Sequence, residues 1–231
     1  MIDINFDFRT DCAPKKDPDS DSQKLQNYHE ILWNKALPNG KIFDLKKGGS
    51  PYDYLHWNGM RFGSDTMNST YSYTGYKAIK DILPDVPDRI LEDFRYRVYT
   101  IGNFIIFPKG KGNSINQDRG SFSSCIKDRF DLTLECIRLY YSNENNEKNP
   151  LHATIQRYKD FFDLFVDFKG YVNFFLLQDL LTTDGKIKFL LGTGNFEEEP
   201  LPQTPIQYVQ YIENASDFIK ARSVRLRLSV A

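Results

Sequence analysis

The sequence is poor in the residues that build disulfide frameworks and structural zinc sites. Its 231 residues include three cysteines, Cys12, Cys125 and Cys136, and none of them belongs to a CxxC pair. An odd count without that spacing argues against both kinds of site. We therefore expect a reducing compartment, the cytoplasm.

Long apolar runs are also missing. The most apolar stretch, 161–181, is interrupted by Asp163, Asp167, Lys169 and Asp179. The first residues, MIDINFDFRTD, do not place a basic segment before an apolar one. A spanning helix needs about 20 mostly apolar residues, and a signal peptide needs both segments. We expect a soluble, intracellular chain without a membrane partner.

No excess of charge of one sign exists. Thirty Lys and Arg face 31 Asp and Glu, for a net charge of −1 and a pI of about 6.3. Nucleic acid would therefore have to be bound by a local basic patch rather than by the overall field. Aromatic residues are abundant instead, with 18 Phe and 14 Tyr, so ring packing should dominate the core.

Familiar catalytic motifs are absent. The chain has no GxSxG, HExxH, GxGxxG or GxxxxGK[ST] segment. Of the three histidines, His56 in YLHWNG is the best candidate general acid or base, because imidazole titrates near neutrality; a structural histidine is the alternative. A metal site would have to gather residues such as His56, Asp65 and Asp131 from distant segments, so no metal is predicted and no cofactor can be named.

Hydrophobic patterning predicts an α+β fold. Short strands are expected at 2–8, 41–45, 52–57, 60–64 and 186–191. Residues 97–101 and 104–108 form either a hairpin around Gly102-Asn103 or one long bulged strand. Helices are expected at 22–36, 74–83, 88–94, 126–141, 149–168, 171–181 and from Pro205 onward, the last one capped by Thr204. The prediction is one domain, 1–231, with a strand-rich N-terminal half packed against a helix-rich C-terminal half. A polar loop is expected near 11–22 and an exposed linker near 196–204.

The polar loop contains three alternating acids, Asp17, Asp19 and Asp21, which resemble the start of a calcium loop. The glycine and the glutamate that such a loop requires are replaced by Ser22 and Tyr28. We interpret the segment as a helix entrance capped by Ser20 or Ser22.

The segment KGKGNSINQDRG suggests an anion site. Lys109 and Lys111 precede a turn formed by Asn116, Arg119 and Gly120. A helix directly after this turn would present free amide N–H groups beside the Arg119 guanidinium, which could hold a phosphate. The alternative is a helix capped by serines, with Arg119 in a structural ion pair.

The following helix carries Asp131, Glu135 and Arg138 between two apolar stripes. Asp131 and Glu135 are a like-charge i,i+4 pair that needs compensation. Lys127 and Arg138 are spaced to provide it. These residues form either a solvated ladder of ion pairs or a polar stripe that faces a cleft.

The C-terminal helix ends in a basic stripe of Lys220, Arg222, Arg225 and Arg227. Phosphate contacts to nucleic acid are one interpretation. Complementing the helix dipole at a solvated end is the other.

A resemblance to an uncharacterised bacterial family, catalogued only as a domain of unknown function, is carried by LWNKALPNGKIFDL, YLHWNG, NFIIFP, INQDRG, DRFDLTLECIR and FFDLFVDFKGYVNFFLLQDLL. The family pattern often has a second histidine after the His56 position, where this chain has Trp57, and Arg-His where it has Leu139-Tyr140. The resemblance implies a shared fold and directs attention to His56, Asn116, Arg119 and the 128–138 helix. It implies no activity, and the departures argue against a role built on paired histidines.

Two hypotheses follow. The first is a domain that binds a phosphate-bearing ligand, a nucleotide or a nucleic-acid end, at the Asn116–Gly120 turn. His56 would then act as acid or base, and Asp131 or Glu135 would orient a partner or a cation. On this hypothesis Arg119→Ala removes ligand binding and spares stability. The second is a non-enzymatic interaction protein, such as an accessory factor of a mobile or defence-related element. Whether the chain is an enzyme stays open.

Overall fold

The computed structural model describes residues 2–50, 53–67, 77–110, 114–120, 122–144, 146–192 and 194–230. The strands are β1 (Lys35–Ala36), β2 (Ile42–Phe43), β3 (Lys46–Ser50), β4 (Asp53–Trp57), β5 (Met60–Thr66) and β6 (Phe104–Lys109). The helices are α1 (Pro18–Asp21), α2 (Gln23–Trp33), α3 (Lys77–Ile82), α4 (Asp88–Arg97), α5 (Ile115–Arg119), α6 (Phe130–Ser142), α7 (His152–Arg157), α8 (Lys159–Phe162), α9 (Phe168–Phe175) and α10 (Pro205–Leu228). Short 3-10 turns are η1 (Phe8–Asp11), η3 (Leu83–Asp85), η4 (Ile101–Asn103), η5 (Asn146–Lys148), η6 (Asp163–Phe165) and η7 (Gln178–Leu180).

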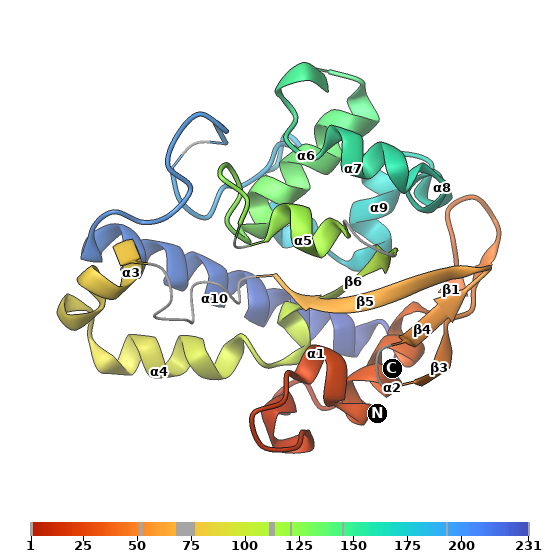
Figure 1. Ribbon diagram of the computed structural model, residues 1–231, viewed down its shortest axis with the longest axis horizontal. Helices are drawn as coiled ribbons and strands as arrows, with labels where there is room; N and C mark the ends of the chain where they lie inside the picture. The colour runs from red at the N-terminus through yellow and green to blue at the C-terminus, as the bar shows by residue number, and fades with distance from the viewer. Residues whose placement is uncertain are drawn as a thin grey trace.

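The predicted α+β class is confirmed, since the strands lie mainly in the N-terminal half and most helices in the C-terminal half. One antiparallel sheet has the order β3-β4-β5-β6, and β1 and β2 form a separate ribbon. Figure 1 shows α5 to α9 above the long strand β5, α1 below it, and α10 crossing the molecule with α4 alongside. Among the helices in the described ranges, none combines the length and apolar content that a bilayer crossing requires.

The core is aromatic, as the composition predicts. Phe165 is edge-on to Tyr171, with 5.2 Å between ring centroids, and Trp33 is edge-on to Phe175 at 5.1 Å. Phe43 links this cluster to Phe62 of β5, with centroids 5.4 Å apart. Such ring pairs add about 0.5–1.5 kcal/mol each beyond the area they bury, so the rings fasten the helices to one face of the sheet.

Helix starts follow the predicted capping residues. The Ser22 hydroxyl accepts a hydrogen bond from Leu25 N and begins α2, and Thr204 accepts one from Gln207 N and begins α10. The loop near 11–22 is not wholly irregular, because Asp17 caps the short helix α1. Residues 74–76 of the helix expected over 74–83 lie outside the described residues.

Several predicted elements were wrong. Residues 2–8 are not a strand, since no neighbouring strand pairs with them in the described part of the chain and Phe8 N donates to Tyr99 O instead. Of the hairpin predicted at 97–108, the second strand is present as β6, whereas the first is replaced by the end of α4 and the start of η4. Gly102 serves close packing there, because a Cβ would lie 2.3 Å from Ile219 O of α10.

The second half is more fragmented than predicted. The helix expected over 149–168 is divided into α7, α8 and η6, and it stops at Val166, whose φ is 70°. Asp167 then caps α9, so Gly170 lies inside a helix rather than between two. The expected strand after Gly185 is reduced to one bridge between Leu181 and Ile187. In the linker near 196–204, residues 197–199 are exposed, whereas 200–202 are buried.

Candidate functional site

A row of basic residues crosses the four-stranded sheet. The register pairs Lys46 of β3 with His56 of β4, His56 with Arg61 of β5, and Arg61 with Lys109 of β6. Directly opposite residues of antiparallel strands point to the same face. All four basic side chains therefore emerge on one face, and we call them the cross-strand row.

The row lies on the open part of this face of the sheet, and we call that open part the outer face. Farther along the same face of β6, Ile105 and Phe107 are buried. The neighbouring register, Leu55 with Phe62 and Phe62 with Pro108, is buried in the core, whereas Lys46 and Lys109 are exposed and His56 and Arg61 are half-buried. Lys46 Nζ donates to Asp44 at 2.8 Å, and Arg61 and Lys109 also interact with neighbouring protein groups.

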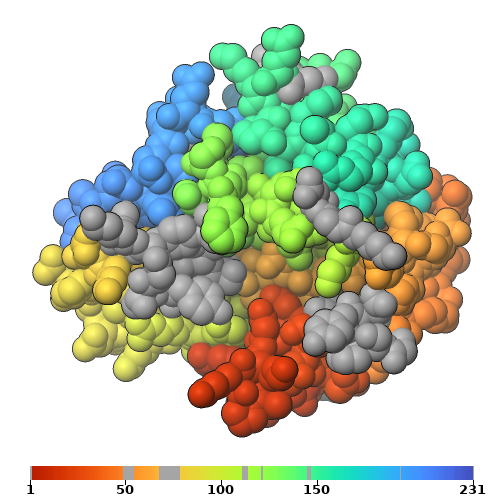
Figure 2. Space-filling view, viewed as in Figure 1, coloured from red at the N-terminus to blue at the C-terminus, as the bar shows by residue number. Residues whose placement is uncertain are grey.

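Asn116 lies beside the row. Its Nδ2 donates to Ser64 O at 3.3 Å, and a Cβ built on Gly63 would lie 3.5 Å from Lys109 Cδ and 3.9 Å from Asn116 Nδ2. The Oδ1 atom of Asn116 is buried and finds no hydrogen-bond partner in the described part of the chain. In Figure 2, α5 (green) lies between the helical region of α6 to α8 and α1 (red). The structure thus brings three predicted site residues, His56, Lys109 and Asn116, to one face.

Arg119 is buried instead of facing a ligand. Its side chain is fully inaccessible, and Nη1 donates to Asp65 Oδ2 at 2.6 Å. Nε donates to Thr133 Oγ1 at 3.1 Å, and Nη2 donates to the carbonyl oxygens of Met67 and Asp128 at 3.2 and 2.7 Å. Protein oxygens occupy the fork that was predicted to hold an anion, so the geometry matches the structural ion pair.

Carboxylates gather around Arg119. Burial raises the pKa of Asp65 to about 7 despite the nearby guanidinium, and burial also raises the pKa of Asp128. Burial raises the pKa of Asp19 well above its ordinary value, with repulsion from Asp65 adding to the effect. The Asp19 Oδ1 atom is buried and has no hydrogen-bond partner among the described residues. Acidic groups thus surround a guanidinium whose donors are already used, which disfavours an anion at Arg119.

A directional hydrogen-bond chain joins this cluster to α2. Trp33 Nε1 donates to His29 Nδ1 at 3.1 Å, so the ring proton lies on Nε2 and is donated to Ser64 Oγ at 2.9 Å. The Ser64 hydroxyl is then left to donate to Asp19, with which it is hydrogen-bonded. Burial lowers the pKa of His29 to about 3, which keeps the ring neutral. Within the described residues, no group of three His, Cys, Asp or Glu side chains is arranged to hold a metal ion.

The helix after the Asn116–Gly120 turn begins later than predicted. The turn is itself the short helix α5, capped by Ser114, and α6 starts at Phe130, ten residues after Gly120. Gly120 has an ordinary φ of −72°, and it is required because a Cβ would lie 2.6 Å from Asn116 O. Two non-glycine residues with positive φ, Lys127 and Asp128, make the bend before α6. The first turn of α6 therefore does not follow Gly120 directly, and it meets Arg119 through the Thr133 hydroxyl, 3.1 Å from Nε.

Asp131 does not face a cleft. It is fully buried in the first turn of α6, where Arg129 binds both of its oxygens and Leu190 N donates to Oδ2 at 2.9 Å. The predicted compensation by Lys127 is replaced by Arg129, because the helix starts at Phe130. Asp131 thus closes the N-terminus of α6 and ties it to the segment before α10.

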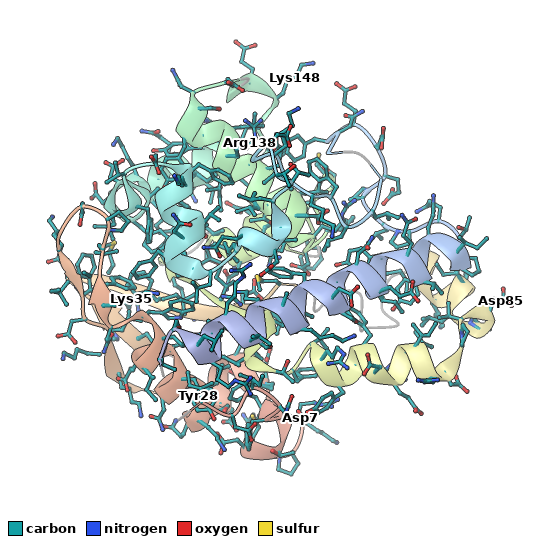
Figure 3. All side chains as sticks on the ribbon, turned by 180° about the vertical axis from the view of Figure 1, so that it is seen from behind. Asp7, Tyr28, Lys35, Asp85, Arg138 and Lys148 are labelled. Carbon is teal, nitrogen blue, oxygen red and sulfur yellow. The ribbon has the colours of Figure 1, made fainter. Side chains whose placement is uncertain are left out.

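Glu135 and Arg138 do border a cleft. Arg138 donates two hydrogen bonds to Glu135, at 2.7 and 2.8 Å, and the pair lines a cavity of about 660 Å³ together with Cys125, Lys148 and Phe196. Figure 3 shows Arg138 and Lys148 at the same end of the molecule. Because the Glu135 carboxylate already accepts hydrogen bonds from the Arg138 guanidinium, this pair has few donors left for an anion.

The basic C-terminal stripe is also divided. Arg222 is fully buried and donates to the carbonyl oxygens of Phe175, Gly102 and Phe104. Arg225 is paired with Asp179 at 2.6 Å. These two cations therefore hold α10 against η4 and η7.

The predicted site residues thus separate into the cross-strand row, the Arg119 cluster and α6. Lys111 lies outside the described residues. Sequence reasoning missed Lys46 and Arg61, although each is a basic residue in or beside a predicted strand. The missing information was strand register, which places four distant residues in one line.

Comparison with known proteins places the chain in a family. No curated protein and no solved structure matches it. A family model described as a family of unknown function, DUF6994, matches residues 2–226, nearly the whole chain. The predicted kinship with a family of unknown function is confirmed, and the chain belongs to the DUF6994 family.

Proposed function

We propose that this chain binds a phosphate-bearing ligand, a nucleotide or the end of a nucleic acid, on the outer face of its four-stranded sheet. The observation that carries the proposal is the cross-strand row of Lys46, His56, Arg61 and Lys109. The ligand class is the one expected from the sequence, but the site moves from Arg119 to the sheet.

The charge of the row supports a polyanion. Like charges directly opposite each other on paired strands destabilise a sheet. Here a lysine, an arginine and a second lysine lie in one line with a histidine between them. A bound phosphate would relieve that repulsion by sharing the cations.

The length of the row supports more than one phosphate. Neighbouring strands lie about 4.8 Å apart, so four strands spread the row over about 14 Å. A single phosphate fills only part of that length. A di- or triphosphate, or a short stretch of nucleic-acid backbone, uses all of it.

Arg61 and Asn116 would position the ligand. A guanidinium can bind a phosphate through two parallel hydrogen bonds, which the lysines cannot. Asn116 lies beside Lys109 across Gly63, where an amide can select among ligand groups by hydrogen bonding. His56 lies between two cations of the row and is the imidazole within reach of a phosphate bound there.

The test is a binding titration by fluorescence anisotropy, with a 5′-phosphorylated single-stranded oligonucleotide, the same oligonucleotide without the phosphate, and nucleoside triphosphates. For a single strand, log K should fall with log salt by about 0.7 for each phosphate neutralised. Arg61→Ala and Lys109→Ala should each weaken binding and make that slope less steep. Lys188→Ala, an exposed lysine outside the row, is the control. Equal binding by all three variants would contradict the proposal.

A second candidate function, a non-enzymatic interaction protein, has one observation in its favour. Phe122, in the loop before α6, is 97% exposed. Exposed aromatic side chains often anchor protein interfaces. Phe122→Ser should then abolish capture of a stoichiometric partner while leaving phosphate-ligand binding unchanged, and an unaltered set of captured proteins would remove this candidate.

A further inference from the structure

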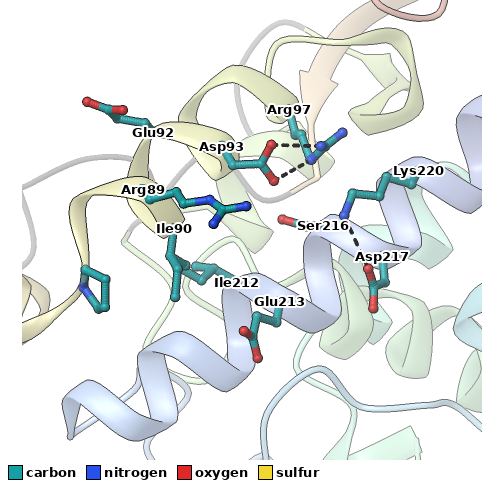
Figure 4. Close-up of a pocket in the computed structure, with 11 residues that line it drawn as sticks. Arg89, Ile90, Glu92, Asp93, Arg97, Ile212, Glu213, Ser216, Asp217 and Lys220 are labelled. Carbon is teal, nitrogen blue, oxygen red and sulfur yellow. Dashed lines mark hydrogen bonds and ion pairs between the residues drawn. The ribbon is translucent and has the colours of Figure 1, made fainter.

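A groove between α4 and α10 lies away from the cross-strand row. It has a volume of about 880 Å³, and its lining includes Arg89, Ile90, Ile212, Glu213 and Ser216. Figure 4 shows side chains of both helices pointing into it. Ligand pockets commonly have volumes of about 300–1,000 Å³, so the groove is large enough for a small organic molecule.

Charged residues on the groove fall into two groups. Arg97 binds Asp93 at 2.7 Å, and Lys220 lies 3.5 Å from Asp217, so these four are already paired within their own helices. Arg89 and Glu213 are different. Among the described residues, none forms a hydrogen bond or an ion pair with either side chain. Glu92 is the third charged residue outside the two pairs, so one guanidinium and two carboxylates remain available at the groove.

Beside Arg89, the lining of the groove combines the Ser216 hydroxyl with apolar side chains. Ser216 is only 6% exposed, and its hydroxyl makes no hydrogen bond to any described residue. In Figure 4 the Ser216 hydroxyl points from α10 toward α4, and the Arg89 side chain points from α4 toward α10. Ile90 and Ile212 lie next to each other below them.

We propose that this groove is a binding site for a zwitterion of the amino-acid type with an apolar side chain. Arg89 and the Ser216 hydroxyl would hold the carboxylate, because a guanidinium binds a carboxylate through two parallel hydrogen bonds. Glu213 would hold the ammonium group, and the apolar side chain would lie against the half-buried Ile90.

A simple anion fits this groove less well than a zwitterion does. Once the two internal pairs are set aside, the lining leaves one cation, Arg89, against two acids, Glu92 and Glu213. An anion alone would add a negative charge to that excess. A ligand that carries both charges satisfies Arg89 and Glu213 together, so its ammonium group is part of recognition.

The experiment is isothermal titration calorimetry of the full chain with L-phenylalanine and L-leucine. Two analogues test the two ends of the ligand: the amino-acid amide has no carboxylate, and the N-acetyl amino acid has no ammonium group. Each should bind about ten- to a hundredfold more weakly than the parent amino acid, which corresponds to removing one hydrogen bond to a charged group. Tight binding of the N-acetyl compound would overturn the assignment of Glu213.

Variants separate this site from the fold and from the cross-strand row. Arg89→Ala should weaken binding by the same about ten- to hundredfold, Arg89→Lys should weaken it less, and Arg95→Ala, an exposed arginine on the same helix outside the groove, should leave it within about twofold. Because Arg89 is exposed, thermal unfolding of all three variants should match the parent. Unchanged affinity in Arg89→Ala, or no heat with either amino acid up to about 10 mM, a weak-binding limit, would overturn the proposal.

Discussion

Arg119 and the cross-strand row are both basic, and they use their charge in opposite ways. Arg119 is fully buried, and four protein oxygens accept its hydrogen bonds. The row is half-buried to exposed, and its cations face one another across paired strands. A cation whose donors are filled by the fold stabilises the fold. The cations of the row also have protein contacts, since Lys46 is paired with Asp44, but they lie on an outer face where a ligand of opposite charge can approach.

The largest effect should come from removing the Arg119 side chain. Arg119→Ala leaves Asp65 and Asp128 buried without their cation, and breaking a buried pair in this way costs about 3–5 kcal/mol. Chemical denaturation of the parent and the variant measures the loss directly. The anion-site hypothesis for Arg119 expects a change of only a few degrees in melting temperature, so one experiment distinguishes the two.

The matched variant for this prediction is Arg119→Lys. A lysine keeps the charge but loses the planar fork that reaches Asp65, Met67 and Asp128 together. It should be less damaging than alanine. If alanine cost under about 1 kcal/mol, the value of an exposed ion pair, Arg119 would not be holding the fold.

The next largest effect concerns the bend that positions Arg119. Gly120→Ala would place a Cβ 2.6 Å from Asn116 O and 3.3 Å from Asp128 Oδ1. Overpacking of this kind costs about 1–3 kcal/mol. Gly63→Ala is the control, since its Cβ would meet Lys109 Cδ at 3.5 Å, an ordinary contact. Equal stability of the two variants would show that the chain at Gly120 relaxes freely.

A third prediction uses pH to examine the carboxylates around Arg119. Burial raises the pKa of Asp19, so the folded chain keeps a proton that the unfolded chain loses above about pH 4. Stability therefore falls as pH rises through the window between the unfolded and folded pKa values. Asp19→Asn removes this titration, so its stability relative to the parent should grow between pH 5 and pH 8, by up to about 1.4 kcal/mol per pH unit.

The control for the pH experiment is Asp160→Asn, an exposed acid on α8. It should shift stability little and leave the pH dependence of the parent intact. An Asp19→Asn variant whose stability follows the parent at every pH would place the raised pKa on another group.

Local signals in the sequence predicted much of the fold. Ser22 and Thr204 begin α2 and α10 because side-chain caps act within a few residues. The α+β class followed from the same local patterning. The first strand of the hairpin around Gly102 was predicted wrongly because Gly102 packs closely against α10, which lies more than 100 residues away in sequence. A local sequence pattern carries no information about such a contact.

The candidate site was predicted less well, and for a similar reason. The sequence singled out His56, Lys109 and Asn116, which the fold brings to one face, but it also singled out Arg119 and Asp131, which are buried with partners. The sequence alone does not distinguish an arginine that is bonded to distant carboxylates from a basic residue that binds a ligand. Lys46 and Arg61 became visible only once strand register aligned them.

The smallest effect on stability should come from the cross-strand row. Its difference from the Arg119→Ala effect is the most direct test of the comparison between the row and Arg119. Arg61→Ala removes a half-buried cation that lies opposite His56 and Lys109, together with its interaction with neighbouring protein groups. The loss of stability should be about that of an exposed ion pair, up to about 1 kcal/mol. The same change should weaken binding of a phosphorylated oligonucleotide and lower its salt slope by about 0.7, since one phosphate contact disappears. Denaturation and anisotropy on one preparation measure both. A variant that unfolds easily would show that Arg61, like Arg119, stabilises the fold. A stable variant with an unchanged salt slope would show that the cross-strand row does not bind the phosphate.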